Sequence, residues 1–165
     1  MVSSLVASAC VDGGPSNADR IFVSAMVPHH RLGIELLDDA VPRVDDVRLR
    51  RLIFKMSAYH GSEMHDLEKR MTGWSVTESI RFAGWISPSA VEELHELSGP
   101  DYDLRWLDLM IAHHEGAVTL ADVEEAEGSD RRLRELARGI AIAQREEIDK
   151  MSQLRSAIAA TEGQG

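Results

Sequence analysis

The feature that most constrains this 165-residue chain is a sequence unit that occurs twice, 84 residues apart. Each copy has an aspartate, a methionine seven residues later, and two adjacent histidines three and four residues after the methionine. A duplicated unit can build a two-fold site between its copies, so we expect the two histidine pairs to act together. The matched residues are Asp19 and Asp103, Met26 and Met110, His29 and His113, and His30 and His114.

The same offset continues beyond the histidines. Leu49 matches Leu133 and Glu63 matches Glu147, whereas His60 falls opposite Gln144. Each half therefore reads as a helix, a short turn and a second helix. We expect one domain over residues 17–160, with repeat 1 at about 17–71, a connector at 72–99 that holds a short helix, and repeat 2 at about 100–160. We expect residues 1–16 to form a flexible N-terminal segment.

The polar residues of the repeat share a face with apolar residues. Because a helix advances about 100° per residue, Asp19, His29 and His30 fall on the same side as Met26, and the second copy repeats this pattern. On the later helix of each half, Glu63 and Glu147 lie on the apolar face with His60 and Gln144. The sequence thus predicts an all-α four-helix bundle, built from two duplicated hairpins, with histidine and glutamate in its interior.

Burying such groups is unfavourable unless they are paired or bind a metal. Imidazole with thioether favours copper, and imidazole with carboxylate suits zinc or iron. We therefore expect a bound transition metal ion, with copper as the first choice and zinc or iron as alternatives. The candidate ligands are His29, His30, His113 and His114, then Met26 and Met110 as soft donors, and His60, Glu63 and Glu147 as ligands or supporting partners.

Two alternatives stay open. A buried His–Glu network could hold a structural or interaction bundle in register without any metal. A di-iron enzyme would need Glu-x-x-His motifs on two core helices, and the one such motif, Glu92 to His95, lies in the connector. We assign no catalytic residues and expect a binding protein more than an enzyme, with a homo-oligomer as an open alternative to a monomer.

Charge and the N-terminus bear on partners and location. The net charge of −10 argues against a nucleic-acid partner, and no stretch is long and apolar enough to span a membrane. Residues 5–10 read LVASAC before a Gly/Pro/Ser-rich stretch, which is similar to the end of a bacterial lipoprotein signal with a lipid anchor at Cys10. An extracytoplasmic protein is the first reading and a cytoplasmic one with a free cysteine the alternative.

The motif M-x-x-H-H followed by Q-x-x-E-I-x-x-M resembles the domain of unknown function 305 family. Met110 to His114 and Gln144 to Met151 fit it closely. The first half fits with His60 in place of glutamine and Leu67 in place of the last methionine. The resemblance implies a ferritin-like fold, export or lipid anchoring, and an association with metals, copper especially, although the family's function is not settled. It adds Gln144 and Met151 to the candidate ligands and implies that the two halves bind metal unequally.

Overall fold

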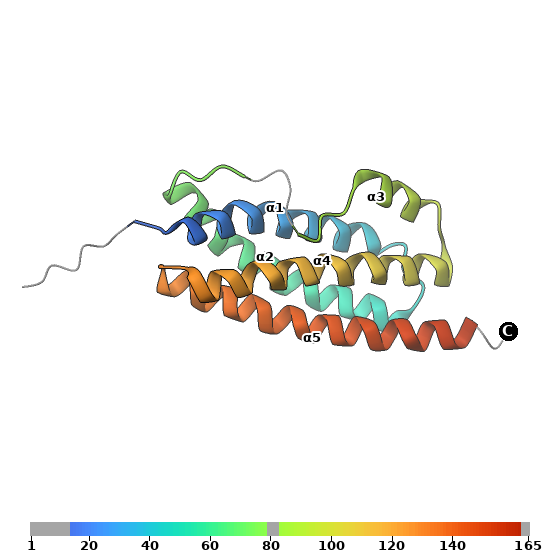
Figure 1. Ribbon diagram of the computed structural model, residues 1–165. Coiled ribbons are helices and arrows are strands. Elements are labelled where there is room, and N and C mark those ends of the chain that lie inside the picture. Colours follow the sequence, from blue (N-terminus) through green and yellow to red (C-terminus); the bar gives the residue numbers. More distant parts are fainter. Residues whose placement is uncertain (1–13, 79–82, 163–165) are drawn as a thin grey trace, which may run out of the picture.

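The computed structural model describes residues 14–78 and 83–162, which form helices and loops without a strand. The helices are α1 (Asn17–Ala40), α2 (Val47–Gly73), α3 (Pro88–His95), α4 (Gly99–Glu127) and α5 (Arg131–Glu162). The four long helices form a bundle, and α3 lies on its outer side near one end (Figure 1). The predicted all-α four-helix bundle is confirmed, with each half contributing one helical hairpin.

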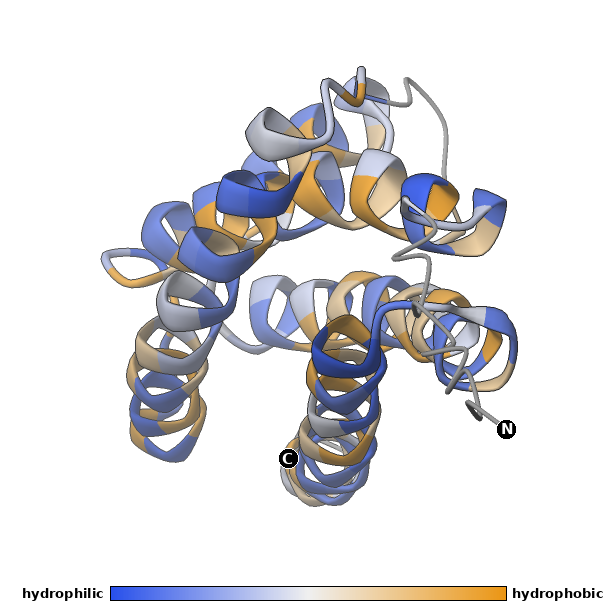
Figure 2. Ribbon diagram, turned by 90° about the vertical axis from the view of Figure 1, so that its left-hand side faces the viewer, coloured by the Kyte–Doolittle hydropathy of each residue, from blue (hydrophilic) through white to orange (hydrophobic). Residues whose placement is uncertain are grey.

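The hairpins pack through their first helices. α1 lies against α2 and α4, and α4 lies against α5, while the contact between α2 and α5 is less extensive than these three. Apolar residues line the sides of the helices that face one another, and polar residues face outward (Figure 2). The burial of apolar area against neighbouring helices is the main source of stability in such a bundle.

The bundle interior contains two apolar clusters separated by a polar layer. One cluster is built around Trp106 and Tyr102, and the other around Phe22. On each long helix the apolar residues of one cluster come before the polar residues, and those of the other cluster come after them. The members of this polar layer are His29, His30, His60, Glu63, His113, His114, Gln144 and Glu147.

The two hairpins are joined by reciprocal aspartate caps. Asp103 of α4 accepts hydrogen bonds from the backbone N–H groups of Asp45 and Asp46, at 3.1 and 2.8 Å, in the turn between α1 and α2. Asp19 of α1 accepts in the same way from the N–H groups at 129 and 130, both at 3.1 Å, in the turn between α4 and α5. The donors are again 84 residues apart, which supports the predicted duplication.

A second carboxyl group lies buried beside Asp19. Burial, and then the hydrogen bond and negative charge of Asp19, raise the pKa of Glu124 to about 8. Its carboxylate occupies the space beside Gly128, where any Cβ would collide with it. This end of the bundle therefore holds two carboxyl groups, of which Asp19 is stabilised as the anion by the turn it caps.

The described helices give no candidate membrane span: none of them combines sufficient length with sufficient apolar character. Residues 1–13 lie outside the described part of the chain, and with them the predicted lipid anchor at Cys10 and most of the predicted flexible segment.

The aspartate caps predict a measurable stability effect. Asp103→Ala removes the acceptor for two backbone donors in the α1–α2 turn, and unfolding in urea should show a loss of about 1.5–3 kcal/mol. Asp101→Ala is the matched control, because Asp101 is exposed in the same helical turn and caps nothing. Equal effects of the two substitutions would contradict the role given to Asp103.

Candidate metal centre

The polar layer brings side chains from all four long helices together. His29 and His30 come from α1, His113 and His114 from α4, and His60 from α2. All five imidazoles are at most 2% exposed. The carboxylates reach closer to solvent, since the side chain of Glu63 is 14% exposed and that of Glu147 is 9% exposed. An ion arriving from solvent would thus meet a carboxylate before an imidazole.

Two His–Glu pairs define the layer. His30 Nε2 donates to Glu63 Oε2 at 2.9 Å, between α1 and α2. His114 Nε2 donates to Glu147 Oε2 at 3.0 Å, between α4 and α5. These equivalent contacts in the two halves show why the histidine and glutamate positions of the repeat occur together: each pair joins the two helices of one hairpin.

His60 lies between the two pairs. Its ring centroid is 5.2 Å from that of His30 and 5.4 Å from that of His114. His60 Nε2 is 3.6 Å from Glu147 Oε2, and neither ring nitrogen of His60 has a hydrogen-bond partner. A buried polar atom without a partner costs about 1–3 kcal/mol, so the imidazole is held at the centre of the layer in an unsatisfied state.

The donor atoms of His60, His114 and Glu147 all lie within 4.8 Å of one another. Zinc binds imidazole nitrogen at about 2.0–2.1 Å and carboxylate oxygen at about 2.0–2.2 Å. Two ligand atoms on one tetrahedral ion are then about 3.3–3.5 Å apart, close to the 3.0 and 3.6 Å that separate Glu147 Oε2 from the two imidazoles. The donor types of these three side chains suit a metal ion, and the two separations that involve Glu147 are close to those around a coordinated ion.

The other two imidazoles are stacked on one another. The rings of His29 and His113 have centroids 3.7 Å apart and an interplanar angle of 16°. His29 Nε2 donates to the carbonyl of His113 at 3.0 Å. His113 Nδ1 donates to the carbonyl of Gly84 at 2.8 Å, which leaves Nε2 of the neutral ring as an acceptor.

A gap at Gly33 of α1 faces this acceptor. A Cβ at position 33 would lie 3.1 Å from His113 Nε2 and 3.5 Å from His60 Nδ1. Both nitrogens are buried and lack a hydrogen-bond partner. The glycine thus leaves room beside two imidazole nitrogens that have no hydrogen-bond partner.

Burial controls the charge of the layer. It lowers the pKa of His29, His30 and His114, and it lowers the pKa of His113 to about 3. These imidazoles are therefore neutral at pH 7, which is the form that binds metals. Burial raises the pKa of Glu147, but the hydrogen bond from His114 and the nearby imidazole of His60 outweigh this effect and bring the pKa to about 2.

The predicted sulfur ligands lie in the apolar clusters. Met26 packs in the cluster around Phe22, and Met110 and Met151 pack in the cluster around Trp106. All three are at most 1% exposed. Gln144 is also buried, and its amide atoms have no hydrogen-bond partner. The roles of these four side chains as ligands stay predictions, whereas the nitrogen and oxygen donors already converge.

The Glu-x-x-His motif of the connector lies away from this layer. His95 ends α3 at the surface, where its Nε2 contacts Asp39 Oδ2 at 2.8 Å, and Glu92 is exposed. The motif therefore does not contribute to a site in the bundle interior, as a di-iron centre would require.

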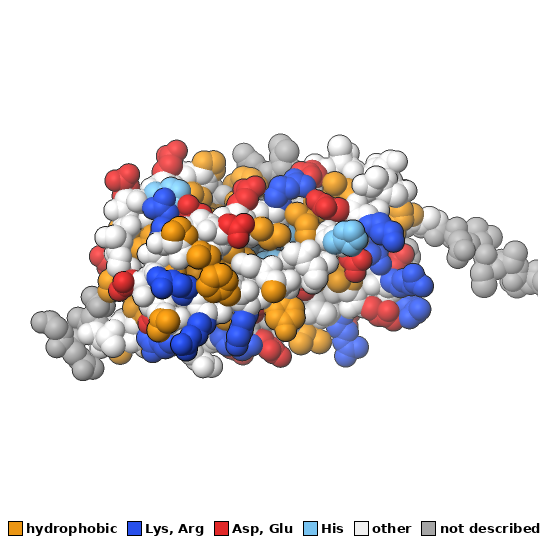
Figure 3. Space-filling model, turned by 180° about the vertical axis from the view of Figure 1, so that it is seen from behind, with side chains coloured by type: hydrophobic (Ala, Val, Ile, Leu, Met, Phe, Trp, Pro, Cys, Tyr) orange, Lys and Arg blue, Asp and Glu red, His pale blue; other side chains and the backbone are white. Residues whose placement is uncertain are grey.

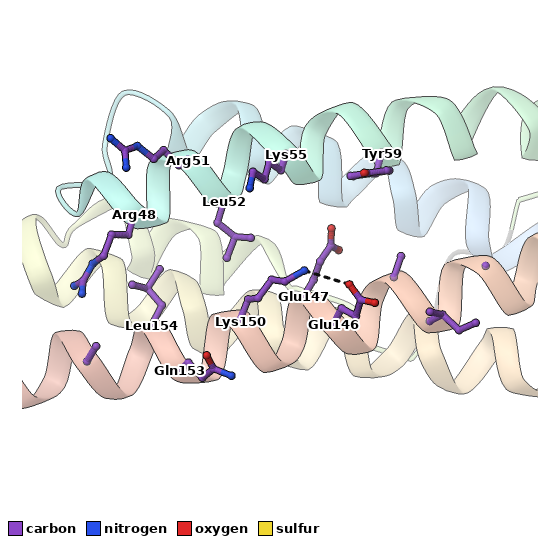
Figure 4. Close-up of a pocket in the computed structure, with 14 residues that line it drawn as sticks. Arg48, Arg51, Leu52, Lys55, Tyr59, Glu146, Glu147, Lys150, Gln153 and Leu154 are labelled. Atoms are coloured by element: carbon purple, nitrogen blue, oxygen red, sulfur yellow. Dashed lines mark hydrogen bonds and ion pairs between the residues drawn. The ribbon is translucent and has the colours of Figure 1, made fainter.

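A groove between α2 and α5 reaches the layer from outside. It has a volume of about 880 Å³ and contains apolar residues such as Leu52 and Leu154 and basic residues such as Lys55 and Lys150. Glu147 points from α5 toward the interior between the two helices, whereas Lys150 pairs with Glu146 at the surface (Figure 4). Hydrophobic side chains also gather among the charged ones on this side of the molecule (Figure 3).

One feature of the centre had no clear sequence signal. The carbonyl of Gly84 orients His113 from the connector, and a backbone acceptor leaves no residue pattern. Gly84 has φ 76°, and a Cβ there would collide with the carbonyl of His113. The glycine before Trp85 could have indicated a close approach between two backbone segments. It does not indicate which helix is approached.

The family model for the Domain of unknown function (DUF305) matches residues 68–155, more than half of the chain. The chain therefore belongs to the DUF305 family. The match includes the second histidine pair and Gln144 to Met151, and it leaves out the first histidine pair. No curated protein sequence matches the chain.

Solved structures share the fold. A DUF305 protein from Streptomyces coelicolor has a TM-score of 0.79 at 23% identity, covering 86% of this chain and 94% of its own. A DUF305 fragment from Deinococcus radiodurans has a TM-score of 0.76 at 23% identity, covering 86% and 97%. CopM in a Cu(I)-bound form has a TM-score of 0.72 at 20% identity, covering 84% and 96%.

The lowered histidine pKa values predict a loss of stability in acid. An unfolded histidine takes up a proton near pH 6.5, but the buried imidazoles stay neutral to lower pH. The unfolded state then binds more protons, so the free energy of unfolding should fall as the pH drops below 6.5. His113, with a pKa of about 3, alone contributes about 2 kcal/mol of this loss at pH 5.

The effect of Glu124 on stability has the opposite sign. Because its carboxyl pKa is raised, the folded state binds more protons than the unfolded state between about pH 4.5 and 8, so this group adds stability as the pH falls. Urea unfolding between pH 7.5 and 5 should therefore be measured in Glu124→Gln, which removes this contribution. The variant should lose stability more steeply than the wild type. A flat profile in the variant would contradict neutral, buried imidazoles.

Proposed function

We propose that this protein binds a transition metal ion in the polar layer of its bundle, with copper as the first ion to test and zinc or iron as alternatives. The observation that carries the proposal is the convergence of His60, His114 and Glu147, whose donor atoms lie within 4.8 Å of one another. The unsatisfied nitrogens of His60 support it further, because coordination of a metal ion would satisfy one of them.

Relatives of the same fold support the choice of copper. CopM has been crystallised in Cu(I)-bound, Cu(II)-bound and Ag-bound forms. In this chain the convergent donors are nitrogen and oxygen, which favour Cu(II) or Zn(II), whereas Cu(I) prefers sulfur. Among divalent ions Cu(II) binds such sites most strongly. A role for Met26, Met110 or Met151 would shift the preference toward Cu(I).

We place this activity outside the cytoplasm. The Streptomyces coelicolor relative is thought to be secreted, and the LVASAC segment before the bundle is similar to the end of a lipoprotein signal. Anchoring through Cys10 belongs to the same proposal. Globomycin-sensitive processing and a lipid-modified Cys10 in the mature protein would test it.

Metal titration tests the proposed function. Protein prepared without chelator and stripped of metal is titrated with Cu(II), Zn(II) and, under reducing conditions, Cu(I). An ion at about 100 times its Kd stabilises the folded state by about 2.7 kcal/mol, which corresponds to about 5–10 °C in Tm for a chain of this size. His114→Ala should weaken binding by about 100-fold or more.

His65→Ala is the matched control for this titration, because His65 is an exposed histidine on α2, outside the polar layer. It should bind metal as the wild type does. A wild-type protein that binds no ion would contradict the proposal and leave the His–Glu pairs as a structural network. In that case His114→Ala would lower stability in the absence of metal and change nothing else.

The groove between α2 and α5 should be the route of the ion, because Glu147 lines it. Ala143→Phe places a large side chain in the groove wall one helical turn before Glu147. Stopped-flow experiments should show slower metal uptake and release, each about several-fold, with an unchanged Kd. Ala58→Phe, on an exposed part of α2, is the control. Unchanged rates would show that the ion enters elsewhere.

A further inference from the structure

The two halves of the bundle are not equivalent at one position of the polar layer. His60 on α2 and Gln144 on α5 correspond in the repeat. His60 belongs to the first half, yet its Nε2 lies 3.6 Å from Glu147 of the second half. The third ligand of the His114–Glu147 pair thus comes from the other hairpin.

His60 of the first half lies beside the His–Glu pair of the second half. By the same relation, Gln144 of the second half belongs with the His–Glu pair of the first half. The repeat predicts that Gln144 faces the His30–Glu63 pair, as His60 approaches the His114–Glu147 pair. The amide of Gln144 is buried and has no hydrogen-bond partner. A neutral amide offers one weak oxygen donor to a transition metal, where an imidazole offers a strong nitrogen donor.

We infer that the chain holds one tightly bound divalent ion, at His60, His114 and Glu147, and that position 144 prevents a second equal site at His30 and Glu63. This inference rests on the proposed function and adds the number and location of the ions. The expected ion is Cu(II) or Zn(II), since all three ligands are imidazole or carboxylate.

The surroundings of the two His–Glu pairs support this difference in metal affinity. His114 and Glu147 gain a third donor that is already held in place by burial and needs little reorganisation. His30 and Glu63 make a contact of nearly equal length, 2.9 Å, but the described residues provide them with no third group in the same compact arrangement of His, Cys, Asp and Glu. Two ligands hold such an ion far less firmly than three.

Exchange of the two residues tests the inference. In His60→Gln both halves carry glutamine, and the tight site should be lost, with affinity lower by about 100-fold or more. In Gln144→His both halves carry histidine, and the number of tightly bound ions should rise from one to two. In the double variant His60→Gln/Gln144→His the chain should again bind one ion, now at His30 and Glu63.

Glutamate substitutions report where that ion sits. In the wild type, Glu147→Gln should abolish tight binding, and Glu63→Gln should leave one ion bound. In the exchanged double variant the result should be reversed, with Glu63→Gln abolishing tight binding. The readouts are the stoichiometry and Kd of Zn(II) and Cu(II) by isothermal titration calorimetry, with circular dichroism of each metal-free variant to confirm folding.

The outcomes separate the inference from the proposed function. A wild-type protein that binds no ion overturns the proposed function. Two equal ions in the wild type, or tight binding that survives His60→Gln, overturn the inference and leave metal binding intact. If a single variant fails to fold, the exchanged double variant, which keeps one histidine and one glutamine in the layer, still gives the site-reversal test with Glu63→Gln and Glu147→Gln.

Discussion

The interaction on which the rest of this structure depends is the hydrogen bond between a buried imidazole and a glutamate on the next helix. It occurs in each hairpin, as His30 with Glu63 and His114 with Glu147. Without these pairs the middle of the bundle would contain isolated polar groups between two apolar clusters, which folding disfavours strongly. With them, the layer fixes how the helices of each hairpin align, and it keeps neutral imidazoles in the interior.

The scaffold around the layer serves to hold these rings in defined orientations. The reciprocal caps of Asp19 and Asp103 tie each hairpin to the turn of the other at the two ends of the bundle. The connector packs on α4 and orients His113 through the carbonyl of Gly84. Gly33 leaves room where an alanine would press on Nε2 of His113 and contact Nδ1 of His60. Gly33 and Gly84, which border the layer without contributing a side chain to it, thus help to determine which nitrogen atoms are available for binding.

Much of this arrangement could be predicted from the sequence, because helical periodicity determines which residues share a face. The inward direction of His29, His30, His113 and His114 followed from their spacing to Met26 and Met110, and the structure buries all of them. Rotations of side chains within the layer could not be predicted. Periodicity places His60 on the inner face of α2, but its approach to Glu147 of the opposite hairpin depends on how closely α2 and α5 approach.

The roles of aspartate and of the connector also required the structure. Asp19 and Asp103 fell on the inner face with the histidines, yet they lie at the ends of the bundle and cap turns. Glu124 has no partner in the repeat, since position 40 is alanine, and so the pattern gave no reason to expect a buried carboxyl there. Contacts between the hairpins depend on how whole helices pack against one another. The pattern of apolar and polar residues along one helix does not contain this information.

The most direct test of this account is a crystal structure of the metal-loaded protein, with anomalous diffraction recorded at the absorption edge of the bound ion. The account predicts one strong anomalous peak between His60, His114 and Glu147, within about 2.0–2.2 Å of their donor atoms. A peak at the protein surface, or one between the His29 and His113 rings with none at Glu147, would contradict it.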